Sequence, residues 1–193
     1  YTYEDLLELF ESATDNFADQ VAMQHQKDGG VIERYTYAEL GEHADRASRI
    51  LSAHGVREDA AVLLVSENRP QWGMAYFGIL EANGIAVPVD PDSSVDELVN
   101  FVESSRARAV LLSNAVAERV GAELEDRLRD SGLPATTLTF AKLFRPALET
   151  DATDPQVDQP DDAAADWEPR RELVRTSEQE SRLASLIYTS GTT

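Results

Sequence analysis

The amino-acid sequence predicts an α/β protein with an open, mostly parallel sheet and flanking helices. Continuous apolar runs of strand length, at 60–65 and 109–112, are typical of strands that are buried on both faces. Segments with apolar residues at helical spacing lie between such runs. Strands that alternate with helices are joined by right-handed crossovers and pair in parallel. Ligands of such sheets bind at the carboxyl ends of the strands.

The first elements predicted are a helix and a β-hairpin. Residues 2–17 carry apolar side chains at helical spacing, and Thr2 with Asp5 resembles a capping box in which the acid replaces the usual glutamate. Segments 21–26 and 31–35 flank an Asp-Gly-Gly turn sequence, which favours two antiparallel strands. We therefore expect a small hairpin after the first helix.

Two helices then flank the first apolar run. Thr36 and Glu39 have the spacing of a capping box, and Gly55 is a natural stop for the helix that they begin. After the strand, Asn68 is the expected cap of the next helix, with Pro70 in its first turn. This arrangement predicts a strand enclosed by two helices.

The remaining elements continue the alternation. We expect strands at 85–89, 109–112 and 136–140. Ser94 and Glu97 form a capping box for the helix between the first two of these strands. An apolar stripe from Val116 to Leu128 predicts the helix before the third.

The chain divides into three parts by composition. Residues 1–148 form the N-terminal α/β portion, and residues 149–180 are an acidic stretch rich in Pro, Asp and Ala that we interpret as an exposed excursion or linker. Residues 181–193 hold a last apolar segment, 183–188, which predicts a strand, and a polar tail.

The 193-residue chain has no cysteine and is strongly acidic, with 17 Lys and Arg against 36 Asp and Glu and a net charge of −19. Binding to nucleic-acid phosphates and to anionic membranes is disfavoured, and no apolar run is long enough for a transmembrane helix. The lack of cysteine fits a cytoplasmic protein. We interpret the scattered acids as a solvated, halophilic shell adapted to high salt, in preference to a polyanion mimic or an acidic interaction surface.

The polar tail after the last predicted strand has the composition of a phosphate-binding loop. Its residues are Thr189, Ser190, Gly191, Thr192 and Thr193. Glycine lets the backbone approach a ligand closely, successive N–H groups can line an anion-binding concavity, and the hydroxyls add donors. Taken alone, these residues also fit a polar turn. They match neither the Walker A motif nor the dinucleotide fingerprint.

Together with Tyr188, these residues resemble the opening of the signature loop of the adenylate-forming (AMP-binding) superfamily, which includes acyl-CoA synthetases, nonribosomal adenylation domains and luciferases. Three upstream segments resemble other stretches of the same family, in the same order: 35–40, 66–72 and 78–91. The sequence from Asn68 to Trp72 is most similar to long-chain fatty acyl-CoA synthetases. In the family the loop continues with Gly, a variable residue, Pro, Lys and Gly.

This resemblance implies that the chain is the N-terminal part of the large domain of an adenylate-forming enzyme. Such enzymes join a carboxylate to the α-phosphate of ATP, release pyrophosphate, and pass the acyl group to the thiol of coenzyme A. Residues Thr189 to Thr193 would hold the β- and γ-phosphates, with Mg²⁺ sharing that role. We expect no catalytic residue and no metal ligand within this chain, and therefore no activity from the fragment alone. The oligomeric state is not indicated.

The resemblance implies a long-chain fatty acid as the carboxylate substrate and a ligase of lipid metabolism. Two alternatives stay open: an adenylation domain for an amino or aryl acid, and a non-catalytic α/β binding module. His25, His43 and His54 have no second ligand at metal spacing and are expected to be structural. Trp72 and Tyr76, four residues apart, are expected to pack in the core.

Overall fold

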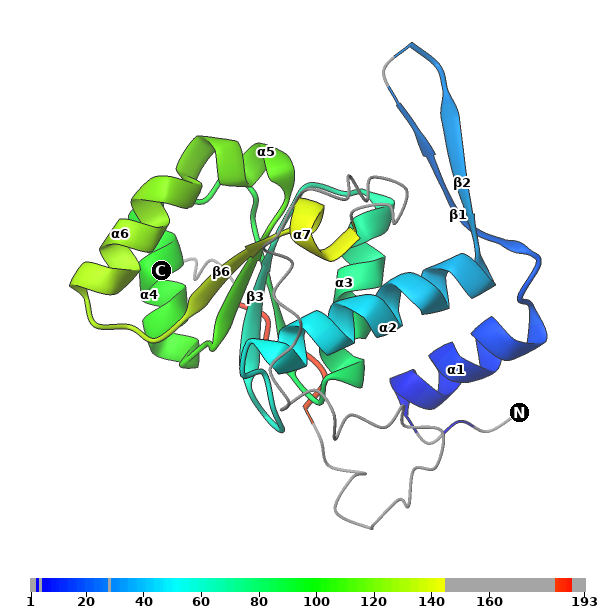
Figure 1. The fold of residues 1–193 in the computed structure, drawn as a ribbon, viewed down its shortest axis with the longest axis horizontal. Helices are drawn as coiled ribbons and strands as arrows, with labels where there is room; N and C mark the ends of the chain where they lie inside the picture. The colour runs from blue at the N-terminus through cyan, green and yellow to red at the C-terminus, as the bar shows by residue number, and fades with distance from the viewer. Residues whose placement is uncertain (1–2, 4, 28, 145–182, 189–193) are drawn as a thin grey trace, which may run out of the picture.

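The computed structural model describes residues 3, 5–27, 29–144 and 183–188. Its centre is a sheet of four parallel strands in the order β4-β3-β5-β6 (Figure 1). The strands are β3 (Ala61–Val65), β4 (Ile85–Val89), β5 (Ala109–Leu112) and β6 (Thr136–Thr139). The α/β class and the parallel sheet expected from the alternation of strands and helices are therefore confirmed.

Helices cover both faces of this sheet, which is why its central strands are continuous apolar runs. All residues of β3 and β5 are buried. Side chains alternate between two cores: Leu63 packs in one and Leu64 in the other. The helices around the sheet are α2 (Tyr37–Ala53), α3 (Pro70–Glu81) and α7 (Phe140–Phe144) on the Leu64 face, and α4 (Val95–Ser105) and α6 (Ala122–Asp130) on the Leu63 face (Figure 1).

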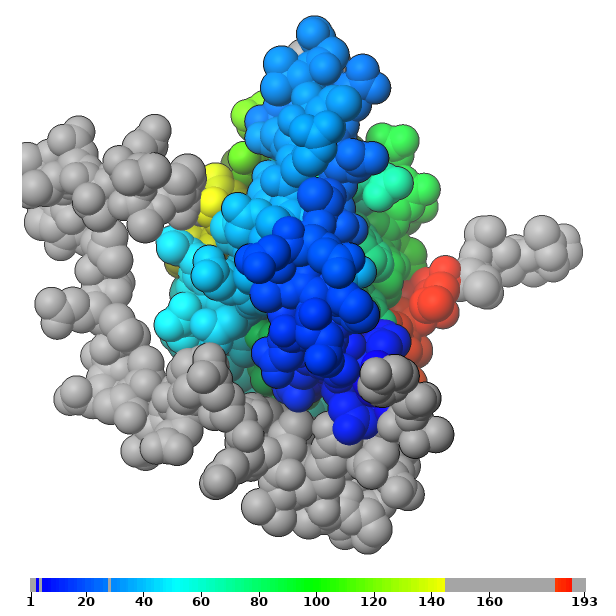
Figure 2. All heavy atoms as spheres, turned by 90° about the vertical axis from the view of Figure 1, so that its right-hand side faces the viewer, coloured from blue at the N-terminus to red at the C-terminus, as the bar shows by residue number. Residues whose placement is uncertain are grey.

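The N-terminal region packs on the outside of α2 and α3. It consists of α1 (Leu6–Asn16) and the antiparallel hairpin β1 (Val21–Gln26) with β2 (Ile32–Thr36), as expected from the turn sequence. The Phe10 ring stacks on Phe77 of α3 with centroids 3.8 Å apart. Figures 1 and 2 show the hairpin projecting beyond the helices.

Two predicted capping boxes are present and two predicted caps are not. Thr36 with Glu39, and Ser94 with Glu97, begin α2 and α4 through reciprocal side-chain and backbone hydrogen bonds. Thr2, the expected cap of the first helix, lies outside the described residues, and the helix begins at Leu6. Asp5 is itself the cap, because its Oδ1 accepts a 2.7 Å hydrogen bond from the Glu8 backbone N–H and the first helical residue, Leu6, directly follows it.

The expected cap of α3, Asn68, lies one residue too early. Arg69 occupies the cap position and makes no capping hydrogen bond with its side chain. Pro70 at the first helical position explains this shift, since its ring presets the helical φ and it has no N–H that needs a partner.

The stripe from Val116 to Leu128 is helical, but its geometry changes along its length. A short α5 (Asn114–Val116) continues through a π-helical turn, Ala117–Gly121, into α6. The predicted strand 136–140 is wrong at its end, because Phe140 begins α7 instead. A local cap and two long-range bonds hold this helix: Thr139 Oγ1 accepts from the Lys142 N–H at 3.3 Å, Asn114 Oδ1 accepts from the Ala141 N–H at 2.9 Å, and Arg46 Nε donates to Leu143 O at 2.8 Å.

The predicted strand 183–188 is reduced to a single parallel bridge, Ser185 to Ala86, beside β4. Figure 2 shows this segment, in red, at the edge of the molecule. Ile187 is 70% exposed, so its side chain lacks the packing contacts that would stabilise a longer strand beside β4. The predicted excursion 149–180 lies outside the described residues. None of the helices in the described part of the chain has the length and apolar character that a membrane crossing needs.

Candidate functional site

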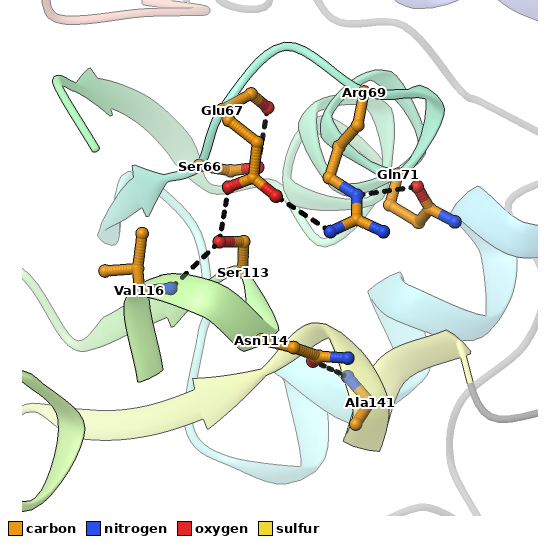
Figure 3. Close-up of polar contacts among 8 residues, drawn as sticks. All are labelled: Ser66, Glu67, Arg69, Gln71, Ser113, Asn114, Val116 and Ala141. Carbon is orange, nitrogen blue, oxygen red and sulfur yellow. Dashed lines mark hydrogen bonds and ion pairs between the residues drawn. The ribbon is translucent and has the colours of Figure 1, made fainter. Parts of the chain in front are cut away.

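The strand order places a topological switch point between β3 and β5. From β3 the chain passes through α3 to β4 on one side of it, and then through α4 to β5 on the other side. Connections that leave in opposite directions open a crevice outside the carboxyl ends of the two central strands, where α/β sheets bind their ligands. The residues that follow β3 and β5 at this edge are Ser66, Glu67, Arg69, Ser113 and Asn114 (Figure 3).

A carboxylate at the switch point joins the ends of the two strands. The Ser113 hydroxyl donates to Glu67 Oε2 at 2.6 Å, and Arg69 Nη1 lies 2.8 Å from Glu67 Oε1. Arg69 Nε also donates to Gln71 Oε1 at 3.0 Å (Figure 3). Burial acts to raise the pKa of Glu67, but the hydrogen bonds from Ser113 and from its own backbone, together with Arg69, outweigh it and lower that pKa. Glu67 is therefore an anion at neutral pH.

Ser113 connects this carboxylate to the first turn of α5. Its side chain is fully buried, and its Oγ accepts from the Val116 N–H at 3.3 Å while its hydrogen points to Glu67. The neighbouring Asn114 caps α7 through its bond from Ala141. These bonds tie together the carboxyl ends of β3, β5 and β6, as Figure 3 shows.

The chemistry available to this cluster is that of a support. Glu67 is ionised and paired, which makes it a poor general acid. Its negative charge also offsets the positive charge of Arg69, which would otherwise attract an anionic ligand. Glu67 and Ser113 stand 46 residues apart in the sequence, and no spacing rule joins them. Polar residues directly after each buried strand, Ser66 and Glu67 after β3 and Ser113 and Asn114 after β5, are the local signal of a polar edge there.

The predicted phosphate-binding residues, Thr189 to Thr193, lie outside the described residues. The residue before them, Tyr188, is described and contacts α4. The loop therefore stays a prediction of the sequence, and only its point of attachment is described.

Two of the three histidines, His43 and His54, make contacts within the fold. His43 packs edge-on between the rings of Tyr35 and Phe144, and burial is the main cause that lowers its pKa. His54 Nδ1 lies 2.8 Å from Ile50 O. Within the described ranges, no three His, Asp or Glu side chains gather in a way that could hold a metal ion.

Trp72 and Tyr76 pack together on α3, as expected from their spacing. Their rings stack with centroids 5.3 Å apart, and both rings lie against the core on the Leu64 face of the sheet. The expectation that this pair serves packing is confirmed.

Sequence comparison finds one family along almost the whole chain: the model of the family described as AMP-binding enzyme matches residues 10–193. Tyrocidine synthase 3 from Brevibacillus parabrevis is 32% identical over 97% of this chain, which spans 2% of that protein. Crotonobetaine/carnitine–CoA ligase from Escherichia coli O1:K1 / APEC is 25% identical over 78% of this chain, which spans 33% of that ligase.

Solved structures of adenylate-forming enzymes share the fold of this chain. A fatty acyl-adenylate ligase from L. pneumophila, in complex with acyl adenylate and pyrophosphate, has a TM-score of 0.67 at 21% identity, over 99% of this chain and 29% of that one. The AMPPNP-bound form of FmoA3, a nonribosomal peptide synthetase, has a TM-score of 0.56 at 31% identity, over 73% of this chain and 14% of that one. The chain thus spans a third or less of these relatives.

Proposed function

The chain belongs to the AMP-binding enzyme family, and we propose that it is the N-terminal part of an enzyme that activates a carboxylate as an adenylate. The observation that carries this proposal is the family match over residues 10–193, which includes the predicted phosphate-binding loop. The superfamily expected from the loop and its upstream segments is confirmed as the family of this chain.

In the proposed reaction, a carboxylate oxygen bonds to the α-phosphorus of ATP, the bond to the bridging oxygen breaks, and pyrophosphate leaves. Phosphoryl-centre substitution depends chiefly on positioning and charge stabilisation. We assign to Thr189 through Thr193 the binding of the β- and γ-phosphates, by backbone N–H groups and hydroxyls. A bound Mg²⁺ would neutralise phosphate charge. The described part of the chain would supply the carboxyl edge of the sheet, where hydrogen bonds join the ends of β3, β5 and β6.

For the substrate, we propose an amino acid as the first candidate. Two relatives that are 30% identical or more over nearly all of this chain are peptide synthases: tyrocidine synthase 3 and a linear gramicidin synthase, both from Brevibacillus parabrevis. These relatives favour the alternative of an adenylation domain over the long-chain fatty acid that the sequence from Asn68 to Trp72 indicated. In that case a carrier thiol takes the place of coenzyme A as acyl acceptor.

A fatty acid is the second candidate, and the observation that favours it is the similarity of Asn68 to Trp72 to long-chain acyl-CoA synthetases. In that case coenzyme A would be the acceptor. The two candidates share the adenylation step and differ in the carboxylate and in the thiol.

A carboxylate panel in the ATP–pyrophosphate exchange assay separates these candidates. The assay uses the full-length natural protein, because residues after Thr193 are expected to complete the loop. Exchange with amino acids alone supports the first candidate, and exchange with long-chain fatty acids alone replaces it with the second. If neither class supports exchange, both substrate candidates are wrong, and if no carboxylate of any class, aryl acids included, supports exchange, the proposed function is wrong.

A further inference from the structure

The turn from α3 into β4 contains the one Asn-Gly dipeptide of the sequence, Asn83-Gly84. Asn-Gly is the dipeptide in which a side-chain amide reacts most readily with the next backbone nitrogen, because glycine has no side chain to hinder the approach. In this reaction the Gly84 nitrogen bonds to Asn83 Cγ and loses its proton, and the side-chain nitrogen leaves as ammonia. Water then opens the resulting succinimide to aspartate or to isoaspartate.

The peptide unit between the two residues is held at both of its polar ends. The Gly84 N–H donates to Ile79 O at 2.9 Å, and Asn83 O accepts from the Asp59 N–H at 3.0 Å. The attack needs this peptide plane to rotate, so that the Gly84 nitrogen faces Asn83 Cγ, and it needs the nitrogen to give up its proton. Both hydrogen bonds must therefore break before the reaction.

Packing around Gly84 restricts the same rotation. Asn83 has a φ of 61°, in the left-handed region, and Gly84 is buried. A Cβ atom on Gly84 would stand 3.0 Å from Ile79 Cγ2 and 3.1 Å from Ala60 O. The peptide plane is thus enclosed between the end of α3 and the residues before β3, and it can turn only when α3 moves away.

We propose that Asn83 is a modification site: its deamidation is blocked in the folded protein and proceeds when the end of α3 opens. Isoaspartate carries the main chain through its side chain and so inserts one additional atom between residues 83 and 84. With that atom, the bonds to Ile79 O and from Asp59 N–H cannot both form again, and β4 begins only two residues later, at Ile85. An opening of α3 is therefore converted into a lasting covalent change.

The test compares the full-length natural protein in buffer and in unfolding urea at one mildly alkaline pH. Digestion and mass spectrometry then measure deamidation and isoaspartate at residue 83. Conversion in urea should match that of an unstructured peptide with the same sequence, and conversion in buffer should be at least about a hundredfold slower. Conversion in buffer at the rate seen in urea overturns the protection, and an unmodified Asn83 in urea overturns the site.

Two variants test whether α3 is the gate. Gly78→Ala crowds α3 against Ala47 of α2 and should raise the conversion of Asn83 in buffer by about tenfold. Gly121→Ala, a glycine with open space, is the matched control and should leave that conversion unchanged. Equal rates in the two variants overturn the gating. If Gly78→Ala does not fold, urea below the unfolding transition gives the same test, because conversion must then rise with urea concentration.

The refolding of converted chains tests the permanence of the change. After removal of urea, chains with isoaspartate at residue 83 should not regain the native circular dichroism spectrum, whereas unconverted chains should. Asn83→Gly, which accepts the left-handed φ and has no side-chain amide, should refold after any time in urea. Converted chains that refold as fully as Asn83→Gly would refute the lasting effect.

Discussion

Glu81 should make the stability of this protein fall as the pH rises. It is the last residue of α3, where the helix dipole is negative. Burial chiefly, and then the charges of Asp45 and Glu11, raise its pKa from 4.5 to about 8. Because the folded state holds the proton more tightly than the unfolded state, protonation stabilises the fold below about pH 4.5, and this stabilisation is lost as the pH rises to 8.

The size of this effect follows from the two pKa values. Each pKa unit corresponds to about 1.4 kcal/mol, so ionisation of Glu81 lowers the free energy of unfolding by about 3.5 kcal/mol between pH 5 and pH 8. Glu81→Gln removes the titration but keeps the shape of the side chain. The variant should therefore gain about that amount over the unmodified chain across the same interval.

Urea unfolding at several pH values, followed by circular dichroism, measures this difference. Glu123→Gln, an exposed position on α6, is the control that removes one negative charge without the burial. The reasoning is refuted if the difference in unfolding free energy between Glu81→Gln and the unmodified chain does not change with pH. It is equally refuted if Glu123→Gln gives the same slope.

Three further predictions concern packing, the switch point and charge. Ser113→Ala should lower the free energy of unfolding in urea by about 2 kcal/mol, because it removes a helix cap and the partner of Glu67; a loss below about 0.5 kcal/mol would contradict the support role. Gly78→Ala should cost about 1–3 kcal/mol, since its Cβ would stand 2.6 Å from that of Ala47, whereas Gly121→Ala, with 3.7 Å of space, should cost nothing; equal costs would rule out the close approach. With a net charge of −19, the melting temperature should rise by about 5 °C or more from low to molar KCl, and a flat response would remove the case for salt adaptation.

The elements that the sequence predicted well are those whose signals are local. The boxes of Thr36 with Glu39 and of Ser94 with Glu97 act within three residues, so the sequence contains both partners of each bond. The buried strands are equally local, because a strand covered on both faces needs a continuous apolar run. The parallel sheet follows from the alternation of these strands with helices.

Some of the features that the sequence analysis missed depend on residues far apart, and others have local causes. The start of helix α7 is capped in part by Asn114, 27 residues earlier in the chain, which accepts a bond from Ala141, and in part by Thr139, which accepts from the Lys142 N–H. The pairing of Glu67 with Ser113 spans 46 residues and exists only after β3 and β5 are neighbours. Pro70 displaced the predicted cap by one residue, which a rule about proline at the first helical position could have found. The substrate class is also a missed point, since the similarity of five residues to long-chain synthetases carried less information than identity along the whole chain.

The products of ATP cleavage by the full-length protein test the central claim most directly. With an accepted carboxylate and a thiol acceptor, an enzyme that activates its substrate as an adenylate forms AMP and pyrophosphate in equal amounts, and no ADP. We predict that result, with formation of both products dependent on the carboxylate. Release of ADP and inorganic phosphate, or no ATP cleavage with any amino acid or fatty acid, would contradict the account.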